Sequence, residues 1–270
     1  NHASAPNKPI SPDIPKNIIM AIIIGVFIGF GCNITNEYFD NTVKSVEFIE
    51  RKKLPVLAII PSIDHKSKTY SNSSKINSDD KKVRNYRLKS VDRIQRRLVT
   101  HEDPRSPISE SYRSLRTSLM YTTKGNQGTI MVSSPGPGEG KTTTIINLAI
   151  TYANLGKKTL LIDGDLRKPV LHKVFNTVIE KGLTHYLSGV EEKWENIINP
   201  TDVENLQIIY SGAIPPNPSE LLGSKVMNNL IRELKEKYDI ILFDAPPILA
   251  VTDAIVLSRL IEQFILVVRF

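Results

Sequence analysis

Residues 133–144 have the sequence SSPGPGEGKTTT and lie between two apolar runs. Glycines in such a stretch let backbone N–H groups turn toward an anion, and Lys141 followed by Thr142 supplies a cation and a hydroxyl. A lysine at this position reaches the β- and γ-phosphates of a nucleotide, and the threonine hydroxyl binds Mg²⁺. The stretch therefore predicts a phosphate-binding loop, although Pro135 stands where such loops usually have their first glycine.

Two apolar segments elsewhere in the chain each end in a carboxylate. LLIDGDLRKP carries Asp163, Asp165 and Arg167, and IILFDAPP carries Asp244. In an open parallel sheet the carboxyl ends of the strands face one crevice, so these side chains should meet the phosphate loop there. Each aspartate alone is explained about as well by a helix cap or a turn. Their convergence predicts a site for a nucleotide and Mg²⁺, which prefers carboxylate and phosphate oxygens.

The elements that must position these residues alternate between strands and helices. Strands are predicted near 129–133, 158–163, 206–210, 239–244 and 264–268, and helices near 141–154, 219–236 and 253–261. The strands are continuous apolar runs, as in a parallel sheet that is covered on both faces. We therefore predict an α/β domain with a doubly wound, mainly parallel sheet of the P-loop NTPase type.

Another helix is predicted to precede the first strand. Ser106 and Pro107 suit its N-cap and first helical position. Its apolar stripe would be Tyr112, Leu115 and Leu119, and a second, charged face would carry Glu110, Arg113 and Arg116. On residue types alone, this charged face is a surface Glu–Arg pair worth a few tenths of a kcal/mol, about 0.2–0.5.

The N-terminal part predicts a membrane span. Between Lys16 and Glu37 lie 20 residues without a charge, about 30 Å of helix, which matches the hydrocarbon core of a bilayer. Prolines stand at every third residue from Pro6 to Pro15, the spacing of polyproline II. A signal peptide has a basic start instead, and a buried soluble helix is the other alternative. We predict a transmembrane helix at 17–36.

The net charge of +7 comes from one segment. Residues 51–100 hold 14 Lys/Arg and 4 Asp/Glu, a balance of +10. A basic segment next to a span lies on the cytoplasmic side by the positive-inside rule. Residues 62–90 are rich in Ser, Asn, Lys and Asp, which predicts a disordered linker. Without a basic folded module or a recognition motif, nucleic-acid binding is not predicted. The single cysteine, Cys32, excludes an intrachain disulfide.

The predicted organisation has four parts. They are a Pro-rich extracytoplasmic tail at 1–16, the span at 17–36, a juxtamembrane segment with the basic linker at 37–97, and the P-loop domain at 98–270. Residue 1 is Asn and the last residues read as a strand, so we expect both ends to be cut from a longer protein and the domain to lack its last helix.

Together these segments resemble the bacterial tyrosine kinases that are fused to polysaccharide co-polymerases. The resemblance covers the regularly spaced prolines from Pro6 to Pro15, the span and the three nucleotide motifs. It also covers the segments EYFDNTVKSVEFIERKKLPVLAIIP, SPISESYRSLRTSL, SGAIPPNPSELLGS and PPILAVTDA. It implies an ATP-dependent protein-tyrosine autokinase in the bacterial inner membrane, with its catalytic domain in the cytoplasm. It also implies a ring-like homo-oligomer, tyrosine phosphorylation in trans, and a role in capsular or exopolysaccharide polymerisation and export.

The resemblance also implies roles for the site residues. ATP would be bound by Gly136, Gly138, Glu139, Gly140, Lys141, Thr142 and Thr143. Mg²⁺ would be held by Thr142, Asp165 and Asp244. Asp163 would take the tyrosine proton, with Lys141 and Arg167 as further catalytic residues. Glu110, Arg113 and Arg116 would contact the neighbouring subunit. The tyrosine cluster that the family carries near its C-terminus is missing from this chain, whose nine tyrosines are scattered.

Two other functions remain open from the sequence. A partition-type or septum-positioning switch ATPase shares the expected fold and transfers phosphate to water. The phosphate loop typical of those proteins has an extra lysine near its start. No lysine lies between Thr129 and Lys141. The second alternative is a polysaccharide chain-length regulator whose nucleotide domain only drives assembly. Eukaryotic-type kinases are excluded, because neither H-R-D nor D-F-G occurs.

Overall fold

The computed structural model describes residues 14–39, 46–61, 98–122 and 128–269. The chain divides into two compact units, residues 1–48 with Phe270 and residues 49–269. The linker predicted at 62–90 lies outside the described residues, as does the Pro-rich tail up to residue 13.

The first unit contains helix α1, Ile14–Phe39. Residues 14–35 are long and apolar enough to cross a membrane, with a mean hydropathy of 2.3 and no part of the window buried. The span predicted at 17–36 lies within α1. The helix begins earlier than predicted, so that Pro15 and Lys16 lie in its first turn. A proline fits there because the first N–H groups of a helix have no partner within it.

The second unit is built on a six-stranded sheet with the order β3-β4-β2-β5-β1-β6. The strands are β1 Gly128–Ser133, β2 Thr159–Asp163, β3 Ile198–Pro200, β4 Leu206–Ile209, β5 Ile240–Asp244 and β6 Gln263–Leu266. Every neighbouring pair is parallel except β3 and β4, which are antiparallel. This sheet confirms the predicted fold class, and β3 is a strand that the sequence pattern did not predict.

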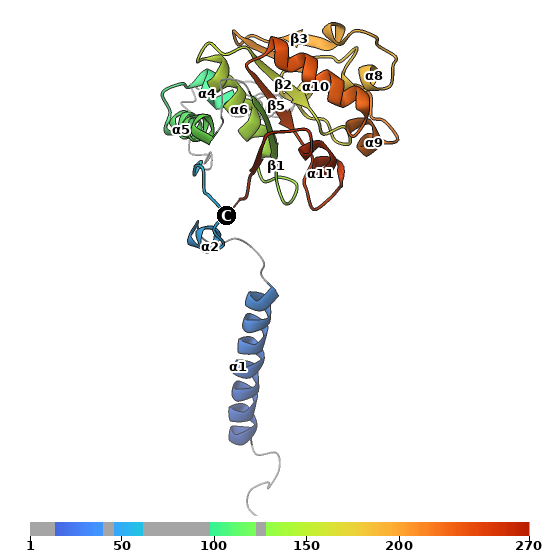
Figure 1. Cartoon of the computed structure of the whole chain (residues 1–270). Coiled ribbons are helices and arrows are strands. Elements are labelled where there is room, and N and C mark those ends of the chain that lie inside the picture. Colours follow the sequence, from blue (N-terminus) through green and yellow to red (C-terminus); the bar gives the residue numbers. More distant parts are fainter. Residues whose placement is uncertain (1–13, 40–45, 62–97, 123–127, 270) are drawn as a thin grey trace, which may run out of the picture. The chain divides into compact units, whose positions relative to one another are not determined.

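The helices of the second unit lie on both sides of the sheet (Figure 1). They are α4 Val99–Glu102, α5 Pro107–Thr122, α6 Lys141–Ala153, α7 Leu171–Val174, α8 Leu183–Leu187, η2 Trp194–Ile197, α9 Pro218–Leu222, α10 Lys225–Lys237 and α11 Asp253–Ser258, with α2 at Val46–Arg51 near the unit boundary. The prediction of one helix at 219–236 is wrong. Gly223 and Ser224 separate α9 from α10, and the Ser224 hydroxyl caps α10 by accepting from Met227 N at 3.1 Å.

Alternate residues of the strands face two separate cores. In β1, Ile130 and Val132 pack in the core that α5 and α6 cover, whereas Met131 packs in the core that α10 and α11 cover. This two-residue period is that of a strand buried on both faces. The predicted stripe of α5, Tyr112, Leu115 and Leu119, belongs to the first of these cores and is at most 3% exposed.

The apolar segment before the linker belongs to the second unit. Leu57, Ala58 and Ile60 pack against the core under α5. Ser118, in α5, donates a hydrogen bond to the carbonyl of Leu57 at 3.3 Å. The domain boundary predicted at residue 98 therefore leaves out a segment, within residues 49–61, that packs on the domain.

Glu191 ties the segment before α8 to the loop between α8 and β3. Its carboxylate accepts hydrogen bonds from Lys181 Nζ at 2.6 Å and from Asn196 Nδ2 at 2.8 Å, and from the backbone N–H of Lys193 at 3.3 Å. These bonds, that of Lys181 above all, lower the pKa of Glu191 from 4.5 to about 2. A lowered pKa means that the ionised carboxylate stabilises the fold above pH 4.5, and that this stabilisation is lost as the pH falls toward 2.

We expect Glu191→Gln to lower the urea midpoint of the protein at pH 7, because the charged acceptor is lost. The difference from the parent should shrink as the pH falls from 4.5 to 2, since the parent carboxylate is then protonated as well. Glu192→Gln, a change at the exposed neighbouring residue, is the control and should leave the midpoint unchanged. Equal midpoints for Glu191→Gln and the parent at pH 7 would contradict the assignment.

Candidate active site

The phosphate loop connects β1 to α6 at the carboxyl edge of the sheet. Gly138 and Gly140 have φ values of +84° and +99°, in the region that favours glycine. Gly136 N donates to the Glu139 carboxylate at 2.8 Å, which closes the loop on itself. Thr143 lies in the first turn of α6, whose N-terminus carries the positive end of the helix dipole. The loop thus has the backbone shape that an anion site at a helix N-terminus requires.

Three strands deliver the predicted charged residues to this loop. Lys141 Nζ lies 3.2 Å from Asp165 Oδ2 and 3.3 Å from Asp244 Oδ1. The Thr142 hydroxyl donates to Asp244 Oδ2 at 2.7 Å. Asp163 is paired with Asp244 in the register of β2 and β5, so it lies beside them. The structure therefore brings together the five residues whose convergence was predicted from the strand pattern.

Lys141 and Asp244 stabilise each other's charge in this buried place. Burial lowers the pKa of Lys141, but the carboxylates of Asp244 and Asp165 outweigh it, and the pKa is raised. Burial raises the pKa of Asp244 beyond what Lys141 and the Thr142 hydroxyl compensate. Lys141 is thus held as a cation between two carboxylates, in the position where a further anion can compete for it.

Asp163 has a different environment from the other two aspartates. It is 0% exposed, and its Oδ2 accepts one hydrogen bond, from Leu171 N at 3.3 Å. Its Oδ1 is buried without a hydrogen-bond partner among the described residues. Burial, and next the charge of Asp244, raises the pKa of Asp163 well above its ordinary value. A carboxylate whose pKa is raised takes up a proton more readily, which suits a general base.

The oxygen atoms at the site fit Mg²⁺ bound together with a phosphate. Within the described parts of the chain, no group of three or more His, Cys, Asp or Glu side chains is placed to hold a metal by itself. Mg²⁺ is usually bound through one or two carboxylates, with phosphate and water completing its shell. Asp165, Asp244 and the Thr142 hydroxyl supply such a partial set of hard oxygen ligands.

Arg167, which the sequence prediction put near the charges of the metal site, pairs with a carboxylate outside the predicted set. Its guanidinium binds Asp253 at two points, with Nε 2.7 Å from Oδ2 and Nη2 3.1 Å from Oδ1. Asp253 is fully buried at the start of α11 and was not singled out as a site residue. Its signal is present in the sequence, since Thr252-Asp253 after an apolar strand and a loop is a typical start of a helix.

The charged residues of α5 do not share one face. Glu110 and Arg113 form an exposed ion pair at 2.6 Å, and Arg113 also donates to the carbonyl of Pro104. Arg116 turns inward and donates to the carbonyl of Thr151, in α6, at 2.6 Å. Each three-residue step falls about 60° short of a full helical turn, so Arg116 lies closer to the buried stripe than Glu110 does. The prediction of a single charged face is wrong for Arg116.

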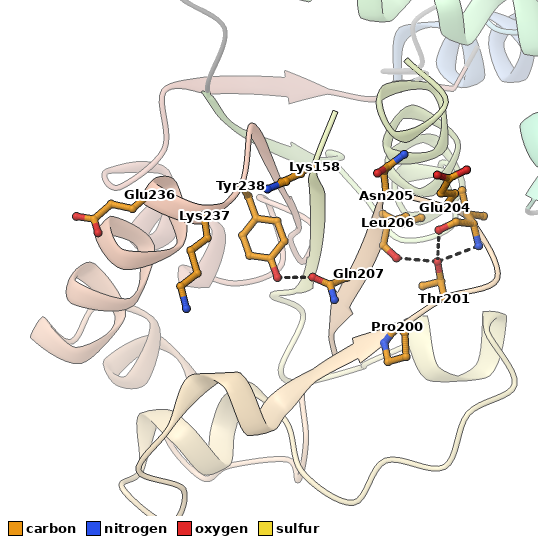
Figure 2. Close-up of a pocket in the computed structure, with 11 residues that line it drawn as sticks. Lys158, Pro200, Thr201, Glu204, Asn205, Leu206, Gln207, Glu236, Lys237 and Tyr238 are labelled. Carbon is orange, nitrogen blue, oxygen red and sulfur yellow. Dashed lines mark hydrogen bonds between the residues drawn. The ribbon is translucent and has the colours of Figure 1, made fainter. Parts of the chain in front are cut away.

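A groove of about 690 Å³ lies at the other edge of the sheet, where β2, β4 and β5 begin (Figure 2). Its lining includes Lys158, Leu206 and Tyr238, and the Tyr238 hydroxyl donates to Gln207 Oε1 at 2.6 Å. None of the predicted site residues lines it. The described residues that were predicted to bind phosphate and Mg²⁺ lie instead at the carboxyl edge, as expected for an open α/β sheet.

Comparisons with known proteins agree with this geometry. A family model described as an AAA domain matches residues 127–267. The tyrosine-protein kinase YwqD of Bacillus subtilis is 42% identical over 177 residues, 65% of this chain and 74% of that protein. The tyrosine-protein kinase ptk of Acinetobacter johnsonii is 33% identical over 99% of this chain, which spans 34% of that longer protein.

The solved structures include a similar domain. The kinase domain of the Escherichia coli tyrosine kinase ETK superposes with a TM-score of 0.70 at 30% identity, covering 84% of this chain and 83% of that one. The chain belongs to the family of bacterial tyrosine-protein kinases.

Proposed function

We propose that the protein is an ATP-dependent protein-tyrosine autokinase that transfers the γ-phosphoryl group of ATP to tyrosines of neighbouring copies. The observation that carries the proposal is the convergence of Lys141, Thr142, Asp165 and Asp244 under the phosphate loop, with the buried Asp163 beside them. A transferring phosphoryl group needs cations around its oxygens and a base near the attacking hydroxyl. This set of side chains provides both.

Each residue then has a defined task. The loop residues Gly136, Gly138, Glu139, Gly140 and Thr143 hold the phosphates of ATP together with Lys141 and Thr142. Thr142, Asp165 and Asp244 hold Mg²⁺, which when bound offsets negative charge on the phosphoryl oxygens. Asp163 accepts the proton of the tyrosine hydroxyl at its carboxylate, and its burial keeps bulk water away from that carboxylate.

The setting of this activity is proposed from the family resemblance. Helix α1 anchors the chain in the inner membrane of the bacterial cell, with residues 1–16 outside the cytoplasm and residues 37–270, including the kinase domain, inside it. The protein assembles as a ring-like homo-oligomer and acts with the machinery of capsular or exopolysaccharide polymerisation and export. The basic juxtamembrane segment agrees with the cytoplasmic placement.

Transfer between copies is tested by mixing two forms of the full-length gene product. The acceptor carries Lys141→Met and a size tag, and the donor is the parent chain. With ATP labelled in the γ-phosphate, we expect label on tyrosine of the tagged acceptor only when the parent is present. Label that stays on the parent chain would contradict transfer in trans, although it would leave the kinase activity standing.

The contact between subunits is tested on α5. The Arg113 side chain is 39% exposed and its ion pair with Glu110 is worth only about 0.2–0.5 kcal/mol, so Arg113→Ala should shift the detergent-solubilised protein toward monomer in sedimentation and lower its melting temperature only slightly. Arg116→Ala should also lower the free energy of unfolding by about 1 kcal/mol, because it removes the hydrogen bond to Thr151. Thr117→Ala, on the exposed side of α5, is the control. An unchanged sedimentation profile for Arg113→Ala would exclude this residue from the interface.

A further inference from the structure

Asp253 joins three segments at the carboxyl edge of the sheet. Its carboxylate, at the start of α11, is 0% exposed and binds Arg167, from the loop after β2, at two points. The Ser219 hydroxyl, in α9, donates a further hydrogen bond to Asp253 Oδ1. Burial raises the pKa of Asp253, but the hydrogen bonds from Arg167 and Ser219 outweigh it, so the pKa is lowered and the group is a carboxylate at neutral pH.

The loop that carries Arg167 also carries Asp165. At its start, Gly164 N donates to the carbonyl at the end of β5 at 2.8 Å, and a Cβ on Gly164 would lie 3.0 Å from the same oxygen. Asp165 Oδ1 accepts from Lys168 N at 3.1 Å, and Oδ2 lies 3.2 Å from Lys141 Nζ. The direction of Asp165 thus depends on the backbone of residues 164–168, which Arg167 ties to α11.

We propose that Asp253 is a positioning residue that acts through Arg167 and holds the loop 164–168 in the conformation in which Asp165 faces Lys141. A guanidinium bound to a carboxylate at two points fixes orientation as well as distance, which one hydrogen bond does not. Asp253 itself is fixed by Ser219 and by its place at the start of α11. The consequence for activity rests on the proposed kinase function, whereas the consequence for the loop does not.

The alternative is an ion pair that only stabilises the fold. A buried carboxylate that loses its partner destabilises a protein wherever it lies, so loss of stability does not separate the two roles. The conformation of the loop does separate them. Arg167→Lys keeps the charge and loses the two-point contact, and its site is 43% exposed, so it is the variant least disturbing to the fold.

The test compares Arg167→Lys, Asp253→Asn and the double variant in the full-length protein purified in detergent. Glu191→Gln, which removes another hydrogen-bonded carboxylate of this unit, is the matched control. The first measurement is hydrogen exchange of the amides of residues 164–168 without nucleotide. We expect it to be about tenfold faster in both single variants and unchanged in the control. The second is the kcat of the kinase, which should fall about 10–100-fold in the single variants.

The double variant decides whether Asp253 acts through Arg167. If it does, the double variant should be no slower than the slower single variant, because the two changes break one contact. Losses that multiply in the double variant would overturn the proposal, as would unchanged loop exchange in both single variants. If the parent chain proves to have no kinase activity, the proposed function fails, and the exchange measurement still judges the role of Asp253.

Discussion

Lys141→Met should weaken the binding of Mg·ATP by about 100-fold. The ammonium group is the cation at the phosphate loop, and truncating one partner of a buried charged contact costs about 2–5 kcal/mol. In the free protein Lys141 already lies within 3.3 Å of Asp165 and Asp244. The methionine therefore removes a positive charge from the phosphates and also leaves two carboxylates that repel them. Isothermal titration with a nonhydrolysable ATP analogue and Mg²⁺ measures the effect.

Lys225→Met is the control for this measurement. Lys225 is an exposed lysine at the start of α10, and its loss changes the net charge by the same amount. We expect its affinity for the analogue to match that of the parent. A Lys141→Met chain that melts cooperatively and binds the analogue as tightly as the parent would contradict the role of the phosphate loop in ATP binding.

Asp163→Asn should lower the kcat for tyrosine phosphorylation by about 100–10,000-fold, the contribution of a general base. The amide has the size of the carboxylate and its oxygen can still accept the hydrogen bond from Leu171 N, but it cannot take a proton. Binding of Mg·ATP should stay within a few fold of the parent, because the described hydrogen bonds of Asp163 do not include Lys141 or Thr142. Asp202→Asn, at an exposed position, is the control and should leave kcat unchanged.

The pKa of Asp163 predicts two pH effects. In the parent, kcat/KM, which reports the free protein, should fall as the pH drops through the raised pKa of Asp163, which lies above the ordinary value of 3.8. For stability the sign is the reverse of a salt-bridged aspartate. A carboxyl with a raised pKa favours folding most below pH 3.8 and loses that stabilisation as the pH rises through its folded pKa. Asp163→Asn, which never ionises, should therefore be at least as stable as the parent at pH 7, and a clear drop in melting temperature would contradict this environment.

The sequence predicts the sheet better than the connections. Five strands appear at the apolar runs from which they were predicted, because such runs can be buried only between two helical layers. Strand β3 could not be predicted in this way, since Ile198–Pro200 is a three-residue edge strand without an apolar run. The break between α9 and α10 is also missed by hydrophobic periodicity, although Gly223 before Ser224 is a recognisable stop and cap.

At the site, the strand pattern predicts which side chains meet but not how they pair. The convergence of Lys141, Asp165 and Asp244 follows from the rule that parallel strands share one carboxyl edge. Which carboxylate Arg167 selects depends on where α11 lies in space, and no local pattern in the sequence contains that. The inward turn of Arg116 was predictable in principle, because a step of six residues along a helix does not return to the same face.

The most direct test of the proposed kinase activity follows where the γ-phosphate goes. The full-length gene product is incubated with γ-labelled ATP and Mg²⁺, and labelled phosphotyrosine and labelled free phosphate are counted in the same reaction. We expect phosphotyrosine to form in the parent and to be nearly absent in Asp163→Asn, while that variant still binds ATP. Water is present at about 55 M, so phosphotyrosine forms only if the site orients a tyrosine hydroxyl and keeps water out of line. Free phosphate without phosphotyrosine in the parent would contradict the kinase and favour a switch ATPase.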